Sequence, residues 1–484
     1  MKKLLTKSNY LIGLKCLRSL WIIKNKPDLV PEFDLDTKHR MENGNKIGQL
    51  AKQYFENGID IPEDDFDKSL KLSKEYLEKR KILFEAGFLF ERFYSRADIL
   101  KPVGENEWDI IEVKSGGKIK EENICDVSYQ KFVYENCGLK IRNCYLMHVN
   151  TDYIFKGKLD LDEFFIIENI NDDIYEIEKN EVNDMLKIID SNEYIGSHCE
   201  NPKTCPIPNL DWNFLPKNSV FTLYNIRIKK AMEYFNNNYI ESKDVLNNFK
   251  LNEKQKIQIN CEISNETHIN KSKIKSFLSK FRYPLYYIDF ETYNPPIPIY
   301  DGMKPYQRIP FQFSLHIQNS HDDKLIHYEF LAEGRSDPRE DFINYINKYI
   351  KNDDGSIVVY NQGFEKGVLK ELSDYDSKFK EIVKSYNDRF VDLLDLFRDF
   401  SYYNPIQNGS CSIKAVLPAI YPEKNHKHLD ICDGMRACIE YEKSIWEYTN
   451  EKQIEKIRKD LLEYCALDTM GMIHIKEELE KLSK

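Results

Sequence analysis

A carboxylate, one spacer and a lysine end a short apolar segment in the first half of the chain. The segment covers residues 109–115 and carries Glu112 and Lys114. Side chains alternate along a β-strand, so these two residues face the same way. Asp98 ends the preceding apolar segment, and an Asp and a Glu on neighbouring strands offer hard oxygen ligands to one or two divalent ions. The lysine can orient an attacking water or stabilise a pentacovalent phosphate. The alternative is an amphipathic hairpin with a solvated Glu/Lys face.

A second set of acids lies in the last third of the chain. Asp289 and Glu291 end an apolar segment, and their i, i+2 spacing puts both on one face of a strand. Desolvating unpaired carboxylates is costly, and metal binding is the ready compensation. Glu365 opens a helix, and Asp468 follows Tyr464 by four residues on another helix, where i and i+4 share a face. The alternative for the first pair is an exposed strand end.

The first group resembles the PD-(D/E)XK nucleases of the RecB-like branch. Their pattern is an Asp, then E-x-K on the next strand, then a helix bearing Q-x-x-x-Y. It is matched in order by Asp98, by Glu112 with Lys114, and by Gln130 with Tyr134. The resemblance implies a restriction-endonuclease-like fold that cleaves DNA phosphodiesters. Asp98 and Glu112 would be metal ligands, Lys114 and Gln130 catalytic, and Tyr134 a contact to the nucleic acid.

One position departs from that family. Several relatives place a metal-binding His on an early helix. In this chain the corresponding helix is expected over residues 44–56, and Gly48 stands where the His would fall. The first metal site is therefore expected to have fewer ligands.

The second group resembles DnaQ-like exonucleases of the DEDD class, in the subtype with a Tyr four residues before the final Asp. Its three motifs are matched by Asp289 and Glu291, by Asn361 through Glu365, and by Tyr464 with Asp468. The resemblance implies four carboxylates holding two Mg²⁺ or Mn²⁺ ions about 4 Å apart. Tyr464 would assist the attacking water, and Asn361 would contact nucleic acid. The second-motif acid is Glu365 where most members have Asp, which leaves room for a different metal geometry.

The chain has eleven cysteines without the dense, even spacing of a secreted disulfide framework. Most are expected to be reduced and buried. The RecB-like branch includes CRISPR-adaptation and recombination nucleases with an iron–sulfur cluster, in which an early Cys joins three that follow the nuclease core. Cys16, Cys199 and Cys205 match three of these positions, and Asp211 stands at the fourth. Four thiolates are the usual requirement. A labile cluster, a zinc ion, a decayed site and purely structural cysteines all stay open.

The pattern of elements positions these groups. Residues 1–218 mix helices with the order strand, strand, strand, helix, strand, which predicts an α/β domain with a mixed sheet. The expected helices cover residues 11–24, 44–56, 67–84 and 126–137, and the expected strands cover 87–94, 95–103, 108–113 and 143–150. Residues 219–281 are polar and helical, which predicts a connector. Residues 282–484 begin with hairpin strands and continue with alternating helices and strands, typical of a ribonuclease-H-like sheet.

Length and composition limit the class of protein. The 484 residues are too many for one ordinary core, so two or three domains are expected. No apolar run approaches the ~20 residues of a membrane span. Charged residues interrupt the apolar N-terminal segment, so it is interpreted as the first helix of a cytoplasmic protein rather than a signal peptide. The net charge of −10 argues against a nonspecific DNA-coating protein but is compatible with a nuclease. A phosphate-binding G-x-x-x-x-G-K-[ST] motif is missing, which argues against an ATP-driven motor.

Together the two halves resemble an uncharacterised bacterial family with a RecB-like N-terminal half and a C-terminal domain of unknown function. We expect a Mg²⁺- or Mn²⁺-dependent nuclease acting on single-stranded DNA or duplex ends in repair, recombination or defence. One alternative is a nucleic-acid-binding protein in which one or both sites are inactive. Another is an RNA-processing exonuclease, since no motif addresses the 2′-hydroxyl.

Overall fold

The chain forms two compact units. The computed structural model describes residues 3–62, 64–194, 196, 199, 201–205, 207–422 and 430–484. The first unit comprises Met1–Phe214 with Pro295–Gln307, and the second comprises Leu215–Asn294 with Arg308–Lys484. The boundary lies close to the expected one at residue 218. The expected connector is part of the second unit, and a segment from within the expected exonuclease domain is part of the first.

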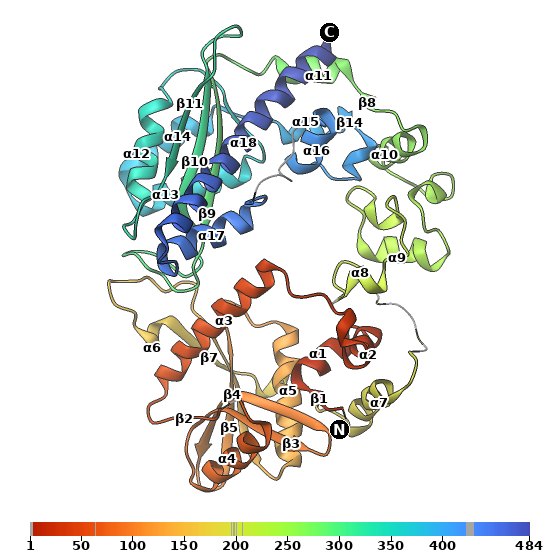
Figure 1. Ribbon diagram of the computed structural model, residues 1–484, viewed down its shortest axis with the longest axis vertical. Helices are drawn as coiled ribbons and strands as arrows, with labels where there is room; N and C mark the ends of the chain where they lie inside the picture. Colours follow the sequence, from red (N-terminus) through yellow and green to blue (C-terminus); the bar gives the residue numbers. More distant parts are fainter. Residues whose placement is uncertain are drawn as a thin grey trace. The chain divides into compact units, whose positions relative to one another are not determined.

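The first unit contains a seven-stranded mixed sheet (Figure 1). Its strands are β1 (Leu5–Thr6), β2 (Ile59–Asp60), β3 (Leu83–Phe90), β4 (Phe93–Val103), β5 (Glu107–Lys114), β6 (Lys140–Val149) and β7 (Phe165–Asn169). β3, β4 and β5 are antiparallel neighbours, whereas β5 and β6 are parallel. Parallel neighbours need a crossover, which α5 (Glu121–Asn136) supplies. The expected order of three strands, a helix and a strand is therefore present.

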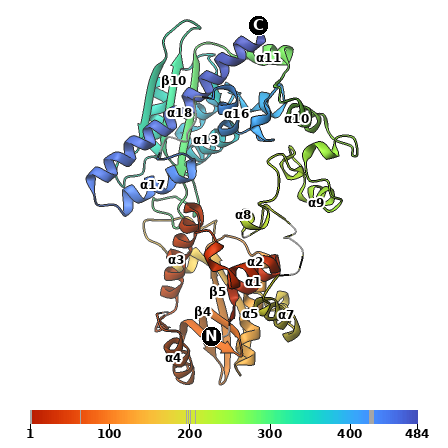
Figure 2. The ribbon, with the colours of Figure 1, turned by 45° about the vertical axis from the view of Figure 1, so that its right-hand side comes forward.

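Helices cover both faces of this sheet (Figures 1 and 2). α1 (Lys7–Lys15) and α5 share a core with Ile110 of β5, while α3 (Leu35–Tyr54) shares a separate core with Ile111. Because side chains alternate along a strand, Glu112 points to the same face as Ile110 and thus toward α5. The alternation of β5 therefore brings the E-x-K pair to the helix that carries Gln130.

The expected helices of this unit have different bounds in the structure. Those expected over residues 44–56 and 126–137 correspond to α3 and to α5, which both begin earlier. The helix expected over residues 11–24 is two helices, α1 and α2 (Leu17–Asn25), because Cys16 between them has extended backbone angles of φ −165° and ψ 110°. The helix expected over residues 67–84 is α4 (Phe66–Glu78), and Leu83 already lies buried in β3. Both errors come from apolar spacing that fits either a helix or the sheet core.

The second unit contains a five-stranded sheet in the order β11-β10-β9-β12-β13. The strands are β9 (Leu285–Tyr293), β10 (Ile309–Gln318), β11 (Ile326–Leu331), β12 (Ile357–Val359) and β13 (Phe390–Asp392). β10 is antiparallel to β9 and β11, and β12 is parallel to β9 and β13. This mixed topology follows from the early hairpin strands and the later α/β alternation.

Helices pack on both faces of the second sheet (Figures 1 and 2). One face packs against α12 (Arg339–Tyr349), α13 (Gly363–Tyr375) and α14 (Lys380–Asn387), and includes Ile288 and Phe290 of β9. The opposite face includes Tyr287 and packs against α16 (Ile413–Ile420) and α18 (Glu451–Ser483). The alternation therefore directs Asp289 and Glu291 toward the face that α18 covers.

The C-terminal part of the expected connector packs onto this second core. The connector residues form α9 (Ile228–Asn236), α10 (Glu253–Ser264), β8 (His268–Ile269) and α11 (Lys271–Leu278). β8 pairs with β14 (Tyr402–Tyr403), and Ile274 and Phe277 of α11 are buried in the same cluster as α18. Within the described part of the chain, no helix is both long enough and apolar enough to cross a membrane.

Candidate metal centres

Three carboxylates meet beside β9 in the second unit, where Asp289 lies in the middle of the strand rather than at its expected end. Ligand oxygens of Asp289, Glu291 and Asp468 all lie within 4.8 Å of one another. Asp468 comes from α18, and Tyr464 lies one turn before it on the same helix. Glu365 comes from the first turn of α13, is 1% exposed, and its Oε2 has no hydrogen-bond partner among the described residues. The structure thus brings Asp289, Glu291 and Asp468 into one group.

Burial and mutual repulsion dominate the electrostatics of this group. Burial, followed by the charge of Asp468, raises the pKa of Asp289 well above its usual range. Burial and the charge of Asp289 do the same to the pKa of Glu291 and to that of Glu365. Within the described residues no lysine or arginine forms an ion pair with Asp289, Glu291 or Glu365. A desolvated acid set without a bound counter-cation fits a hard divalent ion, which supplies the missing positive charge.

Two neighbours of this centre carried no recognisable sequence signal. Lys414, at the start of α16, is exposed, and its charge lowers the pKa of both Asp289 and Glu291 against the larger effect of burial. Its Nζ lies 5.9 Å from the ring centre of Tyr464. Gly434 begins α17 (Gly434–Trp446), and a Cβ there would lie 3.4 Å from Glu291 Oε2. The glycine keeps the space beside Glu291 open.

Burial, with the nearby acid charges, also raises the pKa of Tyr464. Its phenol therefore stays protonated at neutral pH and can donate a hydrogen bond. Asn361 has φ +82°, and its main-chain N–H donates to Asp392 Oδ1 over 2.8 Å. Asp392 also accepts from the N–H of Gln362 over 3.0 Å, so this buried acid fixes the turn that leads to Glu365. The Asn361 side chain is exposed.

The raised pKa values give a pH dependence with a definite sign. In an unfolded chain these acids titrate near pH 4, whereas in the folded metal-free protein they keep protons to higher pH. Their contribution to stability is complete below about pH 4 and is lost as the pH rises toward the folded-state values. Mn²⁺ should therefore raise the melting temperature more at pH 8 than at pH 5. At a hundredfold excess over its Kd, a bound ion adds about 2.7 kcal/mol to the free energy of unfolding.

Thermal unfolding in EDTA and in Mn²⁺ at both pH values measures this effect. Asp289→Asn removes one ligand and one of the repelling charges, so it should lose much of the Mn²⁺ effect. A melting temperature that responds to Mn²⁺ equally in the parent protein and in Asp289→Asn would place the responsible ion elsewhere.

In the first unit, Glu112 lies at the centre of a buried ionic network. Its Oε1 accepts from Lys114 Nζ over 2.7 Å and from Lys7 Nζ over 2.8 Å. Its Oε2 accepts from Gln130 Nε2 over 2.7 Å. Lys114 also donates to Asp126 Oδ2 over 2.6 Å. Burial alone would raise the pKa of Glu112, but the two lysines hold that pKa below its usual value.

Asp98 lies beside this network. It occupies the middle of β4 rather than a strand end, and its Oδ2 accepts from the Val113 N–H over 2.7 Å. Burial, followed by the charge of Glu112, raises the pKa of Asp98 to about 7. Asp98, Glu112 and Lys114 line a cavity of about 540 Å³. Two carboxylates at a cavity, one of which already binds ammonium cations, form a donor set that fits a divalent ion.

Two of the residues predicted for this site have other roles. Tyr134 is fully buried, and its hydroxyl donates to the Ala86 carbonyl over 2.7 Å and accepts from the Ala97 N–H over 2.6 Å. The predicted contact between Tyr134 and nucleic acid is therefore wrong, because this side chain joins two strands inside the core. Gln130 is also fully buried and contacts Glu112 and Asp126, so it positions the network rather than touching a substrate.

Sequence reasoning missed Asp126 and Lys7. Asp126 lies four residues before Gln130 on α5, and this i, i+4 spacing was the available signal. Lys7 had no signal, because it reaches Glu112 through a sequence separation of 105 residues. Gly48 lies where expected, on the α3 side of the same cavity, and a Cβ there would meet nothing within 4 Å. The space that a metal-binding His would fill is thus present.

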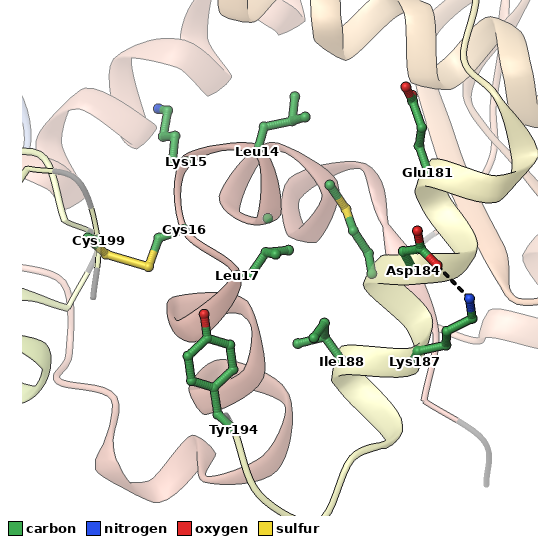
Figure 3. A pocket seen from close by; sticks show the side chains of 12 residues that line it. Leu14, Lys15, Cys16, Leu17, Glu181, Asp184, Lys187, Ile188, Tyr194 and Cys199 are labelled. Atoms are coloured by element: carbon green, nitrogen blue, oxygen red, sulfur yellow. Dashed lines mark hydrogen bonds and ion pairs between the residues drawn. A yellow bond between two sulfur atoms is a disulfide. The ribbon is translucent and has the colours of Figure 1, made fainter. Parts of the chain in front are cut away.

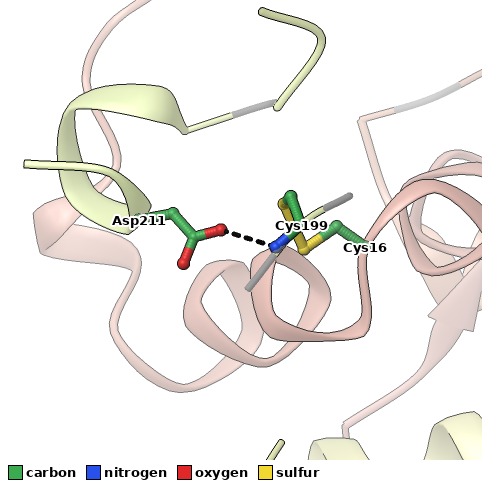
Figure 4. A group of neighbouring side chains, drawn as sticks. All are labelled: Cys16, Cys199 and Asp211. Carbon is green, nitrogen blue, oxygen red and sulfur yellow. Dashed lines mark hydrogen bonds between the residues drawn. A yellow bond between two sulfur atoms is a disulfide. The ribbon is translucent and has the colours of Figure 1, made fainter. Parts of the chain in front are cut away.

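The predicted cysteine group is also brought together. Cys16 and Cys199 form a disulfide (Figure 3). Cys205 keeps a free thiol, and its Sγ lies 3.2 Å from Cys199 Sγ. Asp211 Oδ2 lies 3.7 Å from Cys205 Sγ and accepts from the Cys199 N–H over 3.2 Å (Figure 4). Arg18 pairs with the other oxygen of Asp211 at 2.7 Å. Two of the three predicted ligand sulfurs are therefore paired, although most cysteines are free as expected.

A cavity of about 670 Å³ opens beside this group (Figure 3). Cys16 and Cys199 line it together with residues of α7 (Lys179–Asp190). Ligand atoms of Cys16, Cys199 and Asp211 all lie within 4.8 Å of one another, and Cys205 Sγ is near two of these three residues. After reduction of the disulfide, the same donor set fits iron or zinc through thiolates, with Asp211 as the harder fourth partner.

Comparison with known proteins relates parts of this chain to others. A family model described as a domain of unknown function, DUF2779, matches residues 286–412. The chain is 26% identical over 225 residues to an uncharacterized protein of Mycoplasma pneumoniae, the MG366 homolog. The matched region covers 42% of this chain and 33% of that relative. This chain is 27% identical over 241 residues to the uncharacterized protein UU173 of Ureaplasma parvum, covering 45% and 34%. The chain thus spans about a third of the length of these curated relatives. No solved structure gives a significant match.

Proposed function

We propose that this chain is a metal-dependent DNA nuclease with two sites, a 3′-end-trimming site in the second unit and a PD-(D/E)XK site in the first. The observation that carries the proposal is the convergence of Asp289, Glu291 and Asp468 within 4.8 Å of one another, with Glu365 and Tyr464 as further members of the motifs. These acids come from a strand and two helices. Burial and the charges of neighbouring acids raise the pKa values of Asp289, Glu291 and Glu365, and a bound cation would supply the missing positive charge.

The fold of the second unit supports this proposal. Numbered by their order in this unit, the strands lie 3-2-1-4-5, with an antiparallel hairpin first and parallel strands afterwards. This strand order is typical of a ribonuclease-H-like sheet, in which carboxylates gather beside the central strand. Bound Mg²⁺ or Mn²⁺ ions would supply a water nucleophile and Lewis acidity toward the phosphate. Asp289, Glu291, Glu365 and Asp468 would hold them, and the neutral Tyr464 phenol would orient the water through its hydrogen bond.

In the first unit the same reaction class has a different residue set. Asp98 and Glu112 would hold the ion, and the Lys114 ammonium would stabilise the charge that develops on the phosphate. Gln130 and Asp126 fix the orientations of Glu112 and Lys114 through hydrogen bonds of 2.7 and 2.6 Å. A restriction-endonuclease-like core is consistent with β3, β4 and β5 followed by the α5 crossover to β6.

End-labelled substrates test the proposal directly. Purified protein with Mg²⁺ or Mn²⁺ should shorten single-stranded DNA and the 3′ ends of duplex DNA, and EDTA should stop the reaction. Equal or faster cleavage of matched RNA would favour an RNA-processing exonuclease. Tight binding of DNA without cleavage under any of these conditions would favour a nucleic-acid-binding protein.

We also propose that this protein is cytoplasmic and binds a metal at its cysteine group. The reducing conditions of the cytoplasm would open the Cys16–Cys199 disulfide. If the metal is an iron–sulfur cluster, Asp211 is a harder and weaker ligand for its iron than a thiolate would be. A cluster held partly by Asp211 should therefore be lost in air. Anaerobic protein purified with reductant should be brown and hold about four irons per chain if the cluster is a cubane. Replacing Asp211 with Cys should let the colour survive air.

Iron and zinc analysis of aerobic and anaerobic preparations measures this outcome. Cys199→Ser should abolish the metal, whereas Cys144→Ser, at a buried free thiol in the sheet of the same unit, should not. Anaerobic protein that contains neither iron nor zinc would show that these cysteines serve the fold alone.

A further inference from the structure

Two lysines, not one, bind the carboxylates of the first site. Lys7 Nζ lies 2.8 Å from Glu112 Oε1 and 3.4 Å from Asp126 Oδ1. Lys114 Nζ lies 2.7 Å from Glu112 and 2.6 Å from Asp126. We infer that Lys7 is a second active-site lysine that binds a phosphate of the DNA substrate. The inference rests on the proposed nuclease function of this site.

The backbone on both sides of Lys7 is anchored, so its position is not that of a frayed chain end. On one side, Leu5 pairs with Phe93 of β4, and the Leu5 carbonyl accepts from the Tyr129 hydroxyl over 2.6 Å. On the other side, the Tyr10 ring stacks on the ring of Tyr129 of α5 at a centroid distance of 4.7 Å.

The ends of α1 are held as well. The Thr6 hydroxyl oxygen caps its start by accepting from the Asn9 N–H over 3.3 Å. Cys16 caps its end and is joined to Cys199 by the disulfide. The short β1 strand and α1 thus act together to hold one ammonium group against Glu112.

Exposure places Lys7 on the solvent side of the network. Its side chain is 21% exposed, whereas those of Glu112 and Asp126 are 2% and 4% exposed. An ammonium has three N–H donors, so Lys7 can keep a carboxylate contact while it donates to a phosphate oxygen. Lys114, at 26% exposed, has a similar accessibility. Both lysine side chains are therefore more exposed than the side chains of Glu112 and Asp126.

The charge balance of the four groups favours this role. The charges of Lys7 and Lys114 balance those of Glu112 and Asp126. The E-x-K motif itself contains one lysine, and Lys7 is a second one. A divalent ion at Glu112 would compete with Lys7 for Oε1, because both are cations that bind the same oxygen. Removing Lys7 should therefore weaken DNA binding while leaving Mn²⁺ affinity unchanged or higher. Loss of a purely structural lysine would not weaken DNA binding while sparing Mn²⁺ binding.

The test uses the full chain and three variants. Lys7→Met removes the charge and keeps the length, and Lys7→Arg restores the charge. Lys15→Met, on the same helix, removes a lysine whose surface pair with Glu122 is 54% and 45% exposed. Binding of a labelled DNA duplex is followed by fluorescence anisotropy across a salt series, with Ca²⁺ replacing Mg²⁺. Mn²⁺ affinity is measured by calorimetry without DNA.

For Lys7→Met, the slope of log K against log salt should become shallower by about 0.9, the loss of one phosphate contact. Cleavage by the first site should fall by about 10²-fold. Lys7→Arg should restore the salt slope, and Lys15→Met should match the parent protein in both readouts.

An unchanged salt slope in a folded Lys7→Met protein, or a lower Mn²⁺ affinity, would overturn the role of Lys7 even where the parent protein cleaves DNA. If Lys7→Met does not fold, Lys7→Gln, which still donates to Glu112, provides the same salt-slope comparison. A parent protein that binds DNA through Lys7 but never cleaves it would contradict the proposed function alone.

Discussion

Replacing Asp289 with Asn should abolish 3′-end trimming, with a fall in rate of at least about 10²- to 10³-fold, the effect of removing one preorganised electrostatic group. The neutral amide is a poor ligand for Mg²⁺, and Asp289 lies within 4.8 Å of both other acids of the cluster. The same substitution should stabilise the metal-free protein, because burial and the neighbouring charge of Asp468 make the ionised form of Asp289 costly. Loss of activity with a gain in melting temperature is the expected pair of results.

Trimming of a 3′-labelled strand and thermal unfolding in EDTA measure the two effects. Asp322→Asn is the matched control, since the side chain of Asp322 is 98% exposed and lies outside the acid cluster. If the folded Asp289→Asn protein trims 3′ ends at the parent rate, this acid cluster does not catalyse trimming. Lower stability of the variant in EDTA would contradict the repulsion inferred from burial.

Lys114→Ala should eliminate cleavage at the first site and leave 3′ trimming intact. The Lys114 ammonium bridges Glu112 and Asp126 at 2.7 and 2.6 Å. Removing it leaves Asp126 with the 3.1 Å hydrogen bond from Gln130 and the 3.4 Å contact to Lys7. Cleavage should fall by about 10²-fold or more, as for other charge-stabilising groups. Breaking a buried pair costs about 3–5 kcal/mol, and the partial exposure of Lys114 places the expected loss of stability below that range.

Circular substrates without ends report the first site, and labelled linear strands report trimming. Lys118→Ala removes an exposed lysine from the loop that follows β5 and serves as the control. A Lys114→Ala protein that is folded and loses both activities to the same degree would show that a single site performs both reactions.

Local periodicity predicted those parts of the two sites that lie on one element. The i, i+2 spacing of Asp289 and Glu291 and the i, i+4 spacing of Tyr464 and Asp468 each identify a shared face. The structure then brings β9 and α18 together, so that the acids of both elements meet. The two faces of the sheet are apolar, and packing of helices on both of them brings these elements together. The apolar residues of both faces can be recognised in the sequence.

Contacts between distant segments could not be predicted in the same way. Lys7 and Glu112 meet only because the two-residue strand β1 pairs with β4, and so short an element has no readable periodicity. Tyr134 illustrates the opposite error. A tyrosine one helical turn after Gln130 fits the motif, yet its hydroxyl satisfies two backbone groups in the interior, so it belongs to the core rather than to a nucleic-acid surface.

The segment Pro295–Gln307 has a consequence for the order in which the molecule is made. It lies between β9 and β10 in sequence but belongs to the first unit, where Ile297 and Tyr306 pack on the core that contains Ile111. The Tyr306 hydroxyl also donates to the carbonyl of Ser115, the residue after Lys114. Domains of nascent chains generally fold as units, N-terminal first. Here the N-terminal unit cannot complete its packing until residue 307 has left the ribosome, well after translation of the second unit has begun. The first unit is therefore still incomplete while β9 is synthesised. Tyr306, which contacts Ser115 just after β5, belongs to the last segment of this unit to be translated.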